Sequence, residues 1–150
     1  MEIEFPYSNE ESRTFGIVKR PRMVMRIFSK TRDIWIPIKK TLVDTGADIT
    51  LVPRSIGELL VEDVTTGKYG EMSGIVPGSV LVVYIHKLKI RVGDREFEAP
   101  VAMWLSFAQT HARASLGRVG DSNDVPSVFG RVKGLDLFDA NFSYGKTTKL

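Results

Sequence analysis

The stretch LVDTGADIT, residues 42–50, sends an apolar run directly into an acid. Asp44, Thr45 and Gly46 follow two apolar residues with no polar spacer between them. Asp is favoured at the start of a tight turn and Gly later in it, so the segment predicts a strand that ends in a sharp turn. A carboxylate at the end of a buried strand costs free energy unless it is paired, shared or used in chemistry. Asp44 therefore needs a partner or a chemical role.

The length and composition indicate a globular protein. A chain of 150 residues can bury a substantial core but is short for two domains, so we expect a single domain over residues 1–150. The net charge is only +3, and the Lys and Arg residues are scattered, which predicts no nucleic-acid partner. The chain has no cysteine, which excludes disulfides, thiolate catalysis and Cys-based metal sites.

The sequence does not indicate a membrane or a metal partner either. The longest apolar run, SVLVVYI (79–85), is far too short to span a bilayer. The first residues, MEIEFPYSNEESR, are acidic and interrupted by Pro6, unlike a signal peptide, so we expect a cytoplasmic protein. The two histidines, His86 and His111, lack the spacing of metal ligands, so we expect neither a metal nor another cofactor.

Most of the local patterns are those of β-strands. Residues 22–30 and 33–43 are rich in β-branched and aromatic side chains on either side of a polar turn, which predicts a hairpin. Pro37 indicates that part of the second strand lies at a sheet edge or at a bulge. Residues 88–92 and 97–103 alternate around the turn sequence GDRE, which predicts a second hairpin. We therefore expect an all-β fold.

A few segments are less uniform. Residues 53–63 fit either one short helix or a strand that begins after a turn, and Gly57 weakens the helix. Residues 104–119 carry apolar side chains at roughly helical spacing, which predicts a helix. A short buried strand is expected at 127–130, and a short helix or turn followed by a last strand at 135–144.

Three features follow one another in a specific order. The strand that ends in Asp44 is followed by a glycine-rich segment at 67–79, which is typical of a hairpin or loop, and much later by the apolar-apolar-Gly segment 128–130. This order resembles the retropepsins, the single-domain aspartic proteases that act as homodimers. The resemblance covers roughly residues 22–144. It implies a closed β-barrel of the acid-protease fold with one or two short helices.

The resemblance also implies a role for residues in each feature. Asp44, Thr45 and Gly46 would form the catalytic loop, with the threonine side chains of two subunits interlocking across the dimer axis. The residues implied to bind substrate are Ala47, Asp48 and, in a flap that closes over the cleft, Gly74, Ile75, Val76 and Gly78. The segment implied to support the catalytic loop from behind comprises Val128, Phe129, Gly130 and Arg131. Arg131 is further implied to form an ion pair with Asp48.

The chemistry of the acid explains why a dimer is expected. One carboxylate cannot both activate a water and protonate the reacting groups, whereas two carboxylates that share a proton can. This chain supplies only one D-T-G, so a second Asp44 must come from another copy on a two-fold axis. We therefore expect an aspartic endopeptidase that hydrolyses peptide or protein substrates as a homodimer.

Several features depart from the retropepsin pattern. They are an insertion at about 105–126, a proline in the flap (Pro77) and an N-terminal segment, 1–16, without a clear counterpart. The trailing residues 145–150 are expected to fray. Two other functions fit the sequence. One is a non-catalytic retropepsin-like dimer that binds or scaffolds peptides, and the other is a D-T-G turn in an unrelated monomeric β-barrel.

Overall fold

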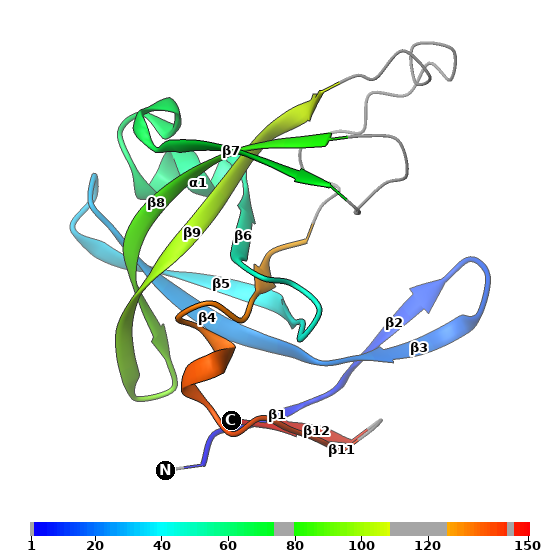
Figure 1. Cartoon of the computed structure of the whole chain (residues 1–150). Coiled ribbons are helices and arrows are strands. Elements are labelled where there is room, and N and C mark those ends of the chain that lie inside the picture. Colours follow the sequence, from blue (N-terminus) through cyan, green and yellow to red (C-terminus); the bar gives the residue numbers. More distant parts are fainter. Residues whose placement is uncertain (1, 74–79, 109–125, 144–145) are drawn as a thin grey trace.

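The computed structural model describes residues 2–73, 80–108, 126–143 and 146–150. Their fold is all-β with one short α-helix, as the sequence predicts (Figure 1). Of the two possibilities for residues 53–63, the helix forms. It is α1, Arg54–Leu60, and the structure adds two short 3-10 turns, η1 (Val64–Thr66) and η2 (Leu135–Leu137). In these residues, no helix is long and apolar enough to cross a membrane.

The main sheet closes on itself to form a barrel. Its strands follow the order β4-β5-β10-β6-β9-β8-β7, and an additional pairing between β4 and β8 completes the ring. Closure leaves few unpaired strand edges. The closed barrel expected from the sequence is therefore present. Its strands are β4 (Arg22–Ser29), β5 (Ile34–Val43), β6 (Thr50–Pro53), β7 (Lys68–Ser73), β8 (Val80–Val92), β9 (Arg95–Ala108) and β10 (Val128–Phe129).

The barrel is filled by alternate side chains of its strands. β4 buries Met23, Met25 and Ile27 in turn, which is the period-2 pattern of a strand with one face on the core. Helix α1 packs against β9 through Gly57, where a Cβ atom would meet the Sδ of Met103 at 2.9 Å. The glycine that weakens the helix thus allows its close approach to the sheet.

Both predicted hairpins are present. β4 pairs with β5, and β8 pairs with β9 around a turn in which Gly93 has a φ of 59°. Pro37 pairs with Arg26 of β4, whereas β10 reaches β5 only at Leu42 and Val43. In the described residues, β5 therefore has a partner on only one side at Pro37, which is the edge position that the sequence predicts.

The prediction of a helix at 104–119 is wrong for its first residues, because these residues continue strand β9. Trp104 is fully buried and pairs with Val83 of β8 and with Pro53 of β6. Pairing with strands on both sides outweighs a weak helical spacing of apolar residues. The rest of that segment, and most of the insertion expected at about 105–126, lies outside the described residues.

The C-terminal residues do not fray as expected. β12 (Thr147–Lys149) lies between β1 (Glu4–Pro6) and β11 (Asn141–Ser143) in a three-stranded sheet. Thr148 and Leu150 are buried. The segment is fixed because strands from opposite ends of the chain pair with it on both sides. Before it, η2 and β11 match the turn and the strand predicted at 135–144, but β11 is not the last strand, because β12 follows it.

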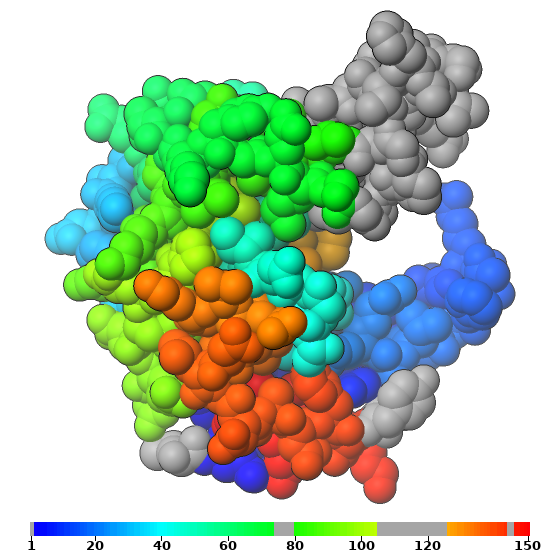
Figure 2. Space-filling view, viewed as in Figure 1, coloured from blue at the N-terminus to red at the C-terminus, as the bar shows by residue number. Residues whose placement is uncertain are grey.

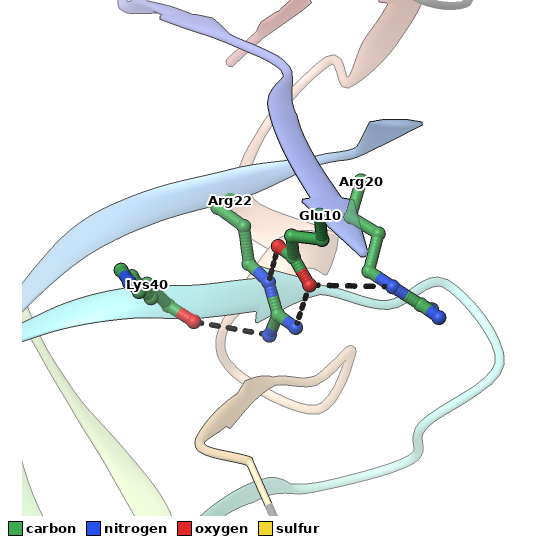
Figure 3. Close-up of polar contacts among 4 residues, drawn as sticks. All are labelled: Glu10, Arg20, Arg22 and Lys40. Atoms are coloured by element: carbon green, nitrogen blue, oxygen red, sulfur yellow. Dashed lines mark hydrogen bonds and ion pairs between the residues drawn. The ribbon is translucent and has the colours of Figure 1, made fainter. Parts of the chain in front are cut away.

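The remaining two strands form a projecting hairpin, which we call the arm. β2 (Ser8–Ser12) pairs with β3 (Gly16–Arg20), and the arm stands away from the barrel (Figure 1). Glu10, the middle residue of β2, ties the arm to β4, because its carboxylate accepts hydrogen bonds from Nε and Nη2 of Arg22 at 2.7 and 2.9 Å (Figure 3). Nη1 of Arg22 also donates to the carbonyl of Lys40 at 3.1 Å. The hydrogen bonds from Arg22 hold the pKa of Glu10 below its ordinary value of 4.5.

We expect Glu10→Gln to loosen the arm without unfolding the barrel. The loss should be about 1 kcal/mol or less, because the ion pair is partly exposed. Since the pKa of Glu10 is lowered in the folded chain, its contribution is present above 4.5 and is lost as pH falls through the lowered value. Hydrogen-exchange protection of the arm amides, measured at about pH 6 and about pH 3, tests both effects.

Glu62→Gln is the control, because Glu62 is exposed and lies outside the arm. It should leave arm protection unchanged. Equal protection in the wild type and in Glu10→Gln at both pH values would contradict this role for the Glu10–Arg22 contact.

Candidate active site

The D-T-G loop, residues 44–49, begins where β5 ends. The N–H of Gly46 donates to Oδ1 of Asp44 at 2.8 Å, and the N–H of Ala47 donates to the carbonyl of Asp44 at 3.3 Å. These bonds make the tight turn that the sequence predicts, and they fix the direction of the carboxylate. Asp44 is partly buried, whereas Thr45 and Gly46 are exposed.

Strand β10 supports the D-T-G loop from behind. It pairs in parallel with the end of β5 and antiparallel with β6, so it lies between the strands that enter and leave the loop. The N–H of Asp44 donates to the carbonyl of Phe129 at 3.2 Å, and the N–H of Arg131 donates to the carbonyl of Ala47 at 2.9 Å. The Phe129 ring is fully buried, with its centroid 6.2 Å from that of Phe97. The loop is thus joined to a strand that is itself fixed in the core.

Gly130 approaches the D-T-G loop so closely that a side chain would not fit. A Cβ atom at this position would overlap the backbone carbonyl of Ile49. The N–H of Gly130 donates to Oγ1 of the buried Thr50 at 3.2 Å. This hydroxyl satisfies an N–H that would otherwise be buried without a partner. Thr50 is therefore a supporting residue that the sequence analysis missed.

The ion pair expected between Arg131 and Asp48 does not form within the chain. Instead, Nε of Arg131 lies 3.6 Å from Oδ1 of Asp136, and the two side chains are 54% and 53% exposed. So exposed a pair contributes little to stability. Asp48 is held through its backbone, because its carbonyl accepts a hydrogen bond from the N–H of Val132 at 2.8 Å. The loop is braced by main-chain bonds rather than by a charge pair.

The D-T-G loop opens onto a cleft of about 530 Å³. The cleft brings this loop together with the end of β7, the strand that leads into the expected flap. Its volume alone does not distinguish it, since a cleft beside Phe138 measures about 490 Å³. What distinguishes it is the acid on a rigid loop. The lining residues are Leu42, Asp44, Gly46, Ala47, Asp48, Ile49, Leu51, Met72, Ser73, Pro126 and Val128.

Five of the residues that the sequence singled out line this cleft, and the others lie elsewhere. Thr45 is exposed on the loop, and Phe129, Gly130 and Arg131 lie behind it. The expected flap residues Gly74, Ile75, Val76 and Gly78 lie outside the described residues. The sequence analysis missed Leu42, Ile49, Leu51, Met72, Ser73 and Pro126. A strand side chain that faces a cleft has the same apolar pattern as one that faces the core, and only closeness to Asp44 in sequence could have marked the first three.

The described residues engage one oxygen of the acid. Asp44 accepts a side-chain hydrogen bond at Oδ1, and none of these residues donates to Oδ2. In the same residues, no group of three or more His, Cys, Asp or Glu side chains could hold a metal ion. A fixed carboxylate beside apolar walls is suited to acid–base chemistry on an amphipathic substrate such as a peptide.

We expect Gly130→Ala to destabilise the protein by about 3 kcal/mol, because the main chain of Ile49 can move aside only if the D-T-G loop moves with it. Urea unfolding measures the loss. Gly70→Ala is the matched control, since a Cβ there would meet only side-chain methyls, of Val83 at 3.3 Å and of Ile85 at 3.6 Å. Equal stability of the two variants would mean that the close approach imposes no constraint.

Comparisons with known proteins show a likeness to solved structures and not to known sequences. No model of a protein family matches the sequence, and no curated protein matches it. Among solved structures, the chain matches EIAV protease complexed with the inhibitor HBY-793. The match covers 75% of this chain and 83% of that chain, at 19% sequence identity and a TM-score of 0.44. At this identity the likeness concerns the fold alone.

Proposed function

We propose that the protein is an aspartic endopeptidase that acts as a homodimer, with one active site made by the Asp44 carboxylates of two subunits. One observation carries the proposal: Asp44 lines a cleft on a loop that β10 holds from behind. Thr45 and Gly46, next to it, are exposed and leave the loop accessible to a second copy.

The proposed dimer supplies what one chain lacks. The chain contains a single D-T-G, and hydrolysis of an amide needs one carboxylate that accepts a proton and one that donates a proton. A two-fold axis beside the loop would bring the two Asp44 side chains together. Like charges in contact cannot both ionise easily, so the pair would hold one proton between them.

The proposed reaction needs no covalent intermediate. A water between the two carboxylates loses a proton to the ionised one and attacks the carbonyl carbon of the scissile bond. The protonated carboxyl donates its proton to the carbonyl oxygen, and the pair then returns a proton to the departing amine. Because the two acids act as a unit, the rate should depend on pH as a bell-shaped curve.

The walls of the cleft favour an apolar segment of substrate. Leu42, Ile49, Leu51 and Met72 surround the acid with hydrophobic surface. A peptide bound in extended form places successive side chains on opposite sides, so some would enter this surface. We therefore propose that the preferred cleavage sites carry large apolar residues beside the scissile bond.

We expect Asp44→Asn to keep the fold and to abolish cleavage. Asn has nearly the same shape but neither accepts nor donates the proton, so the loss should be on the order of 10²–10⁴-fold or more. The variant and the wild type are each incubated with an unfolded protein from acid to neutral pH, and fragments are identified by mass spectrometry. Asp94→Asn, in the exposed turn between β8 and β9, is the control and should cleave like the wild type.

This experiment, together with sedimentation equilibrium of the wild type, decides among the functions that the sequence left open. Cleavage by the wild type and not by Asp44→Asn supports the protease. A dimer of the wild type that binds unfolded protein without cutting it would favour the non-catalytic binding module. A monomer at all concentrations would favour a D-T-G turn with no catalytic role.

We expect Thr45→Ala to weaken the dimer while leaving each subunit folded. In the proposed dimer, Thr45 loses water contact and gains a hydrogen bond to the other subunit, so its removal should raise the dissociation constant by roughly tenfold. Sedimentation equilibrium over a dilution series measures this constant. Thr31→Ala, another exposed threonine in the turn between β4 and β5, should leave it unchanged. Identical dissociation constants for the two variants would contradict a place for Thr45 in the interface.

A further inference from the structure

The arm has a defined shape up to its tip. Oγ of Ser12 accepts hydrogen bonds from the N–H groups of Thr14 and Phe15, both at 3.3 Å. Gly16 has a φ of 70°, which completes a three-residue turn of the kind that closes hairpins. An isolated two-stranded hairpin is at best marginally stable in water. The arm therefore needs a surface to pack against beyond its own two strands.

One face of the arm and its tip carry apolar side chains into solvent. Ile17 lies opposite Glu11, and Lys19 lies on the same face two residues further along. Phe15 at the tip is 79% exposed and Ile17 is 63% exposed, the highest values among the large hydrophobic residues that the structure describes. Exposed apolar groups bordered by charges are typical of an interaction surface.

The root of the arm lies beside the candidate active site. The N–H of Val43, the residue before Asp44, donates to the carbonyl of Pro21 at 2.9 Å. Arg22 lies opposite Leu42 in the pairing of β4 with β5. The contacts in Figure 3 fix this root, and Figure 2 shows the arm extending beyond the barrel. The arm thus starts next to the strand end that presents the acid, and it points away from its own barrel.

We propose that the arm is a dimer contact in which Phe15 and Ile17 pack against the second copy of the chain. This inference rests on the proposed function, which puts the two-fold axis beside Asp44. A projection made of five-residue strands spans about 17 Å. If its root lies beside the axis and its direction is away from its own barrel, the other subunit is the surface it meets.

The charges on the arm favour a copy of the chain over a strongly charged partner. Its outward face carries one acid, Glu11 on β2, and one base, Lys19 on β3, both next to Ile17. A two-fold interface brings the same patch of both copies together, so residue i of one meets residue j of the other and the reverse. A face with both signs of charge fits the surface of a chain with a net charge of only +3, whereas a nucleic acid or an acidic peptide would select a single sign.

The absence of cysteine from the sequence allows a direct test. Phe15→Cys is labelled with benzophenone maleimide, and the labelled protein is mixed with ¹⁵N-labelled wild-type chain at a concentration where dimers exchange. After illumination, mass spectrometry identifies cross-linked peptides that join a ¹⁴N and a ¹⁵N chain. Thr31→Cys, in the turn between β4 and β5, is the control site. We expect mixed-isotope cross-links from Phe15→Cys and none from Thr31→Cys.

A second pair of variants measures the strength of the contact. Ile17→Ser should raise the dissociation constant of the dimer by roughly tenfold, as for a moderately important interface residue. Ile34→Ser is matched to it, because Ile34 is 51% exposed and lies at the opposite end of β5 from Asp44. It should leave the constant unchanged. At concentrations well above the dissociation constant, Ile17→Ser should cleave like the wild type, since Ile17 does not line the cleft.

The outcomes separate this proposal from the proposed function. A wild-type dimer that cleaves peptides but gives no mixed-isotope cross-link overturns the arm contact and leaves the protease standing. A dimer with the cross-link but no cleavage supports the arm and overturns the catalytic role. Cross-links to an added unfolded substrate instead of the second chain would make the arm a substrate contact and overturn the proposal. A wild type that stays monomeric overturns both.

Discussion

The position of Asp44 depends on main-chain hydrogen bonds between two segments that are far apart in the sequence. Phe129 and Arg131 bond to the two ends of the turn around Asp44, and Gly130 bonds to Thr50, 80 residues away. The backbone of the loop cannot shift without breaking several of these bonds. The acid is therefore placed by the order of strands in the barrel, with β10 between β5 and β6, rather than by the loop itself.

Bracing by the backbone has a physical consequence for the site. An ion pair such as the one expected between Arg131 and Asp48 would weaken with salt and would be lost when the acid is protonated. Main-chain bonds between Ala47, Asp48 and the segment after β10 do not titrate. A loop held in this way keeps its shape across the acidic pH range in which a carboxylate pair would work. Protonation of the acids would therefore not weaken the hydrogen bonds that support the loop.

The sequence predicted the parts of the fold that have local signals. Asp44 and Gly46 marked the turn, alternation marked both hairpins, and the short apolar run ending at Gly130 marked β10. It failed where distant strands decide the structure. Trp104 is a strand residue because β6 and β8 flank it, and the C-terminal residues are ordered because β1 and β11 enclose β12. The cleft-lining residues of β6 and β7 carried no separate signal, because apolar strand residues follow the same sequence pattern whether they line a cleft or fill the core.

The N-terminal segment lies outside the resemblance to retropepsins, but the fold places part of it in the arm, beside the D-T-G loop. In the proposed dimer, each subunit holds half of the catalytic pair, so the population of active sites follows the population of dimers. A contact that strengthens the dimer then raises activity without touching the cleft. An arm rooted beside Val43 is suited to this task, because its apolar tip adds buried area at the interface while Glu10 and Arg22 fix its direction from behind.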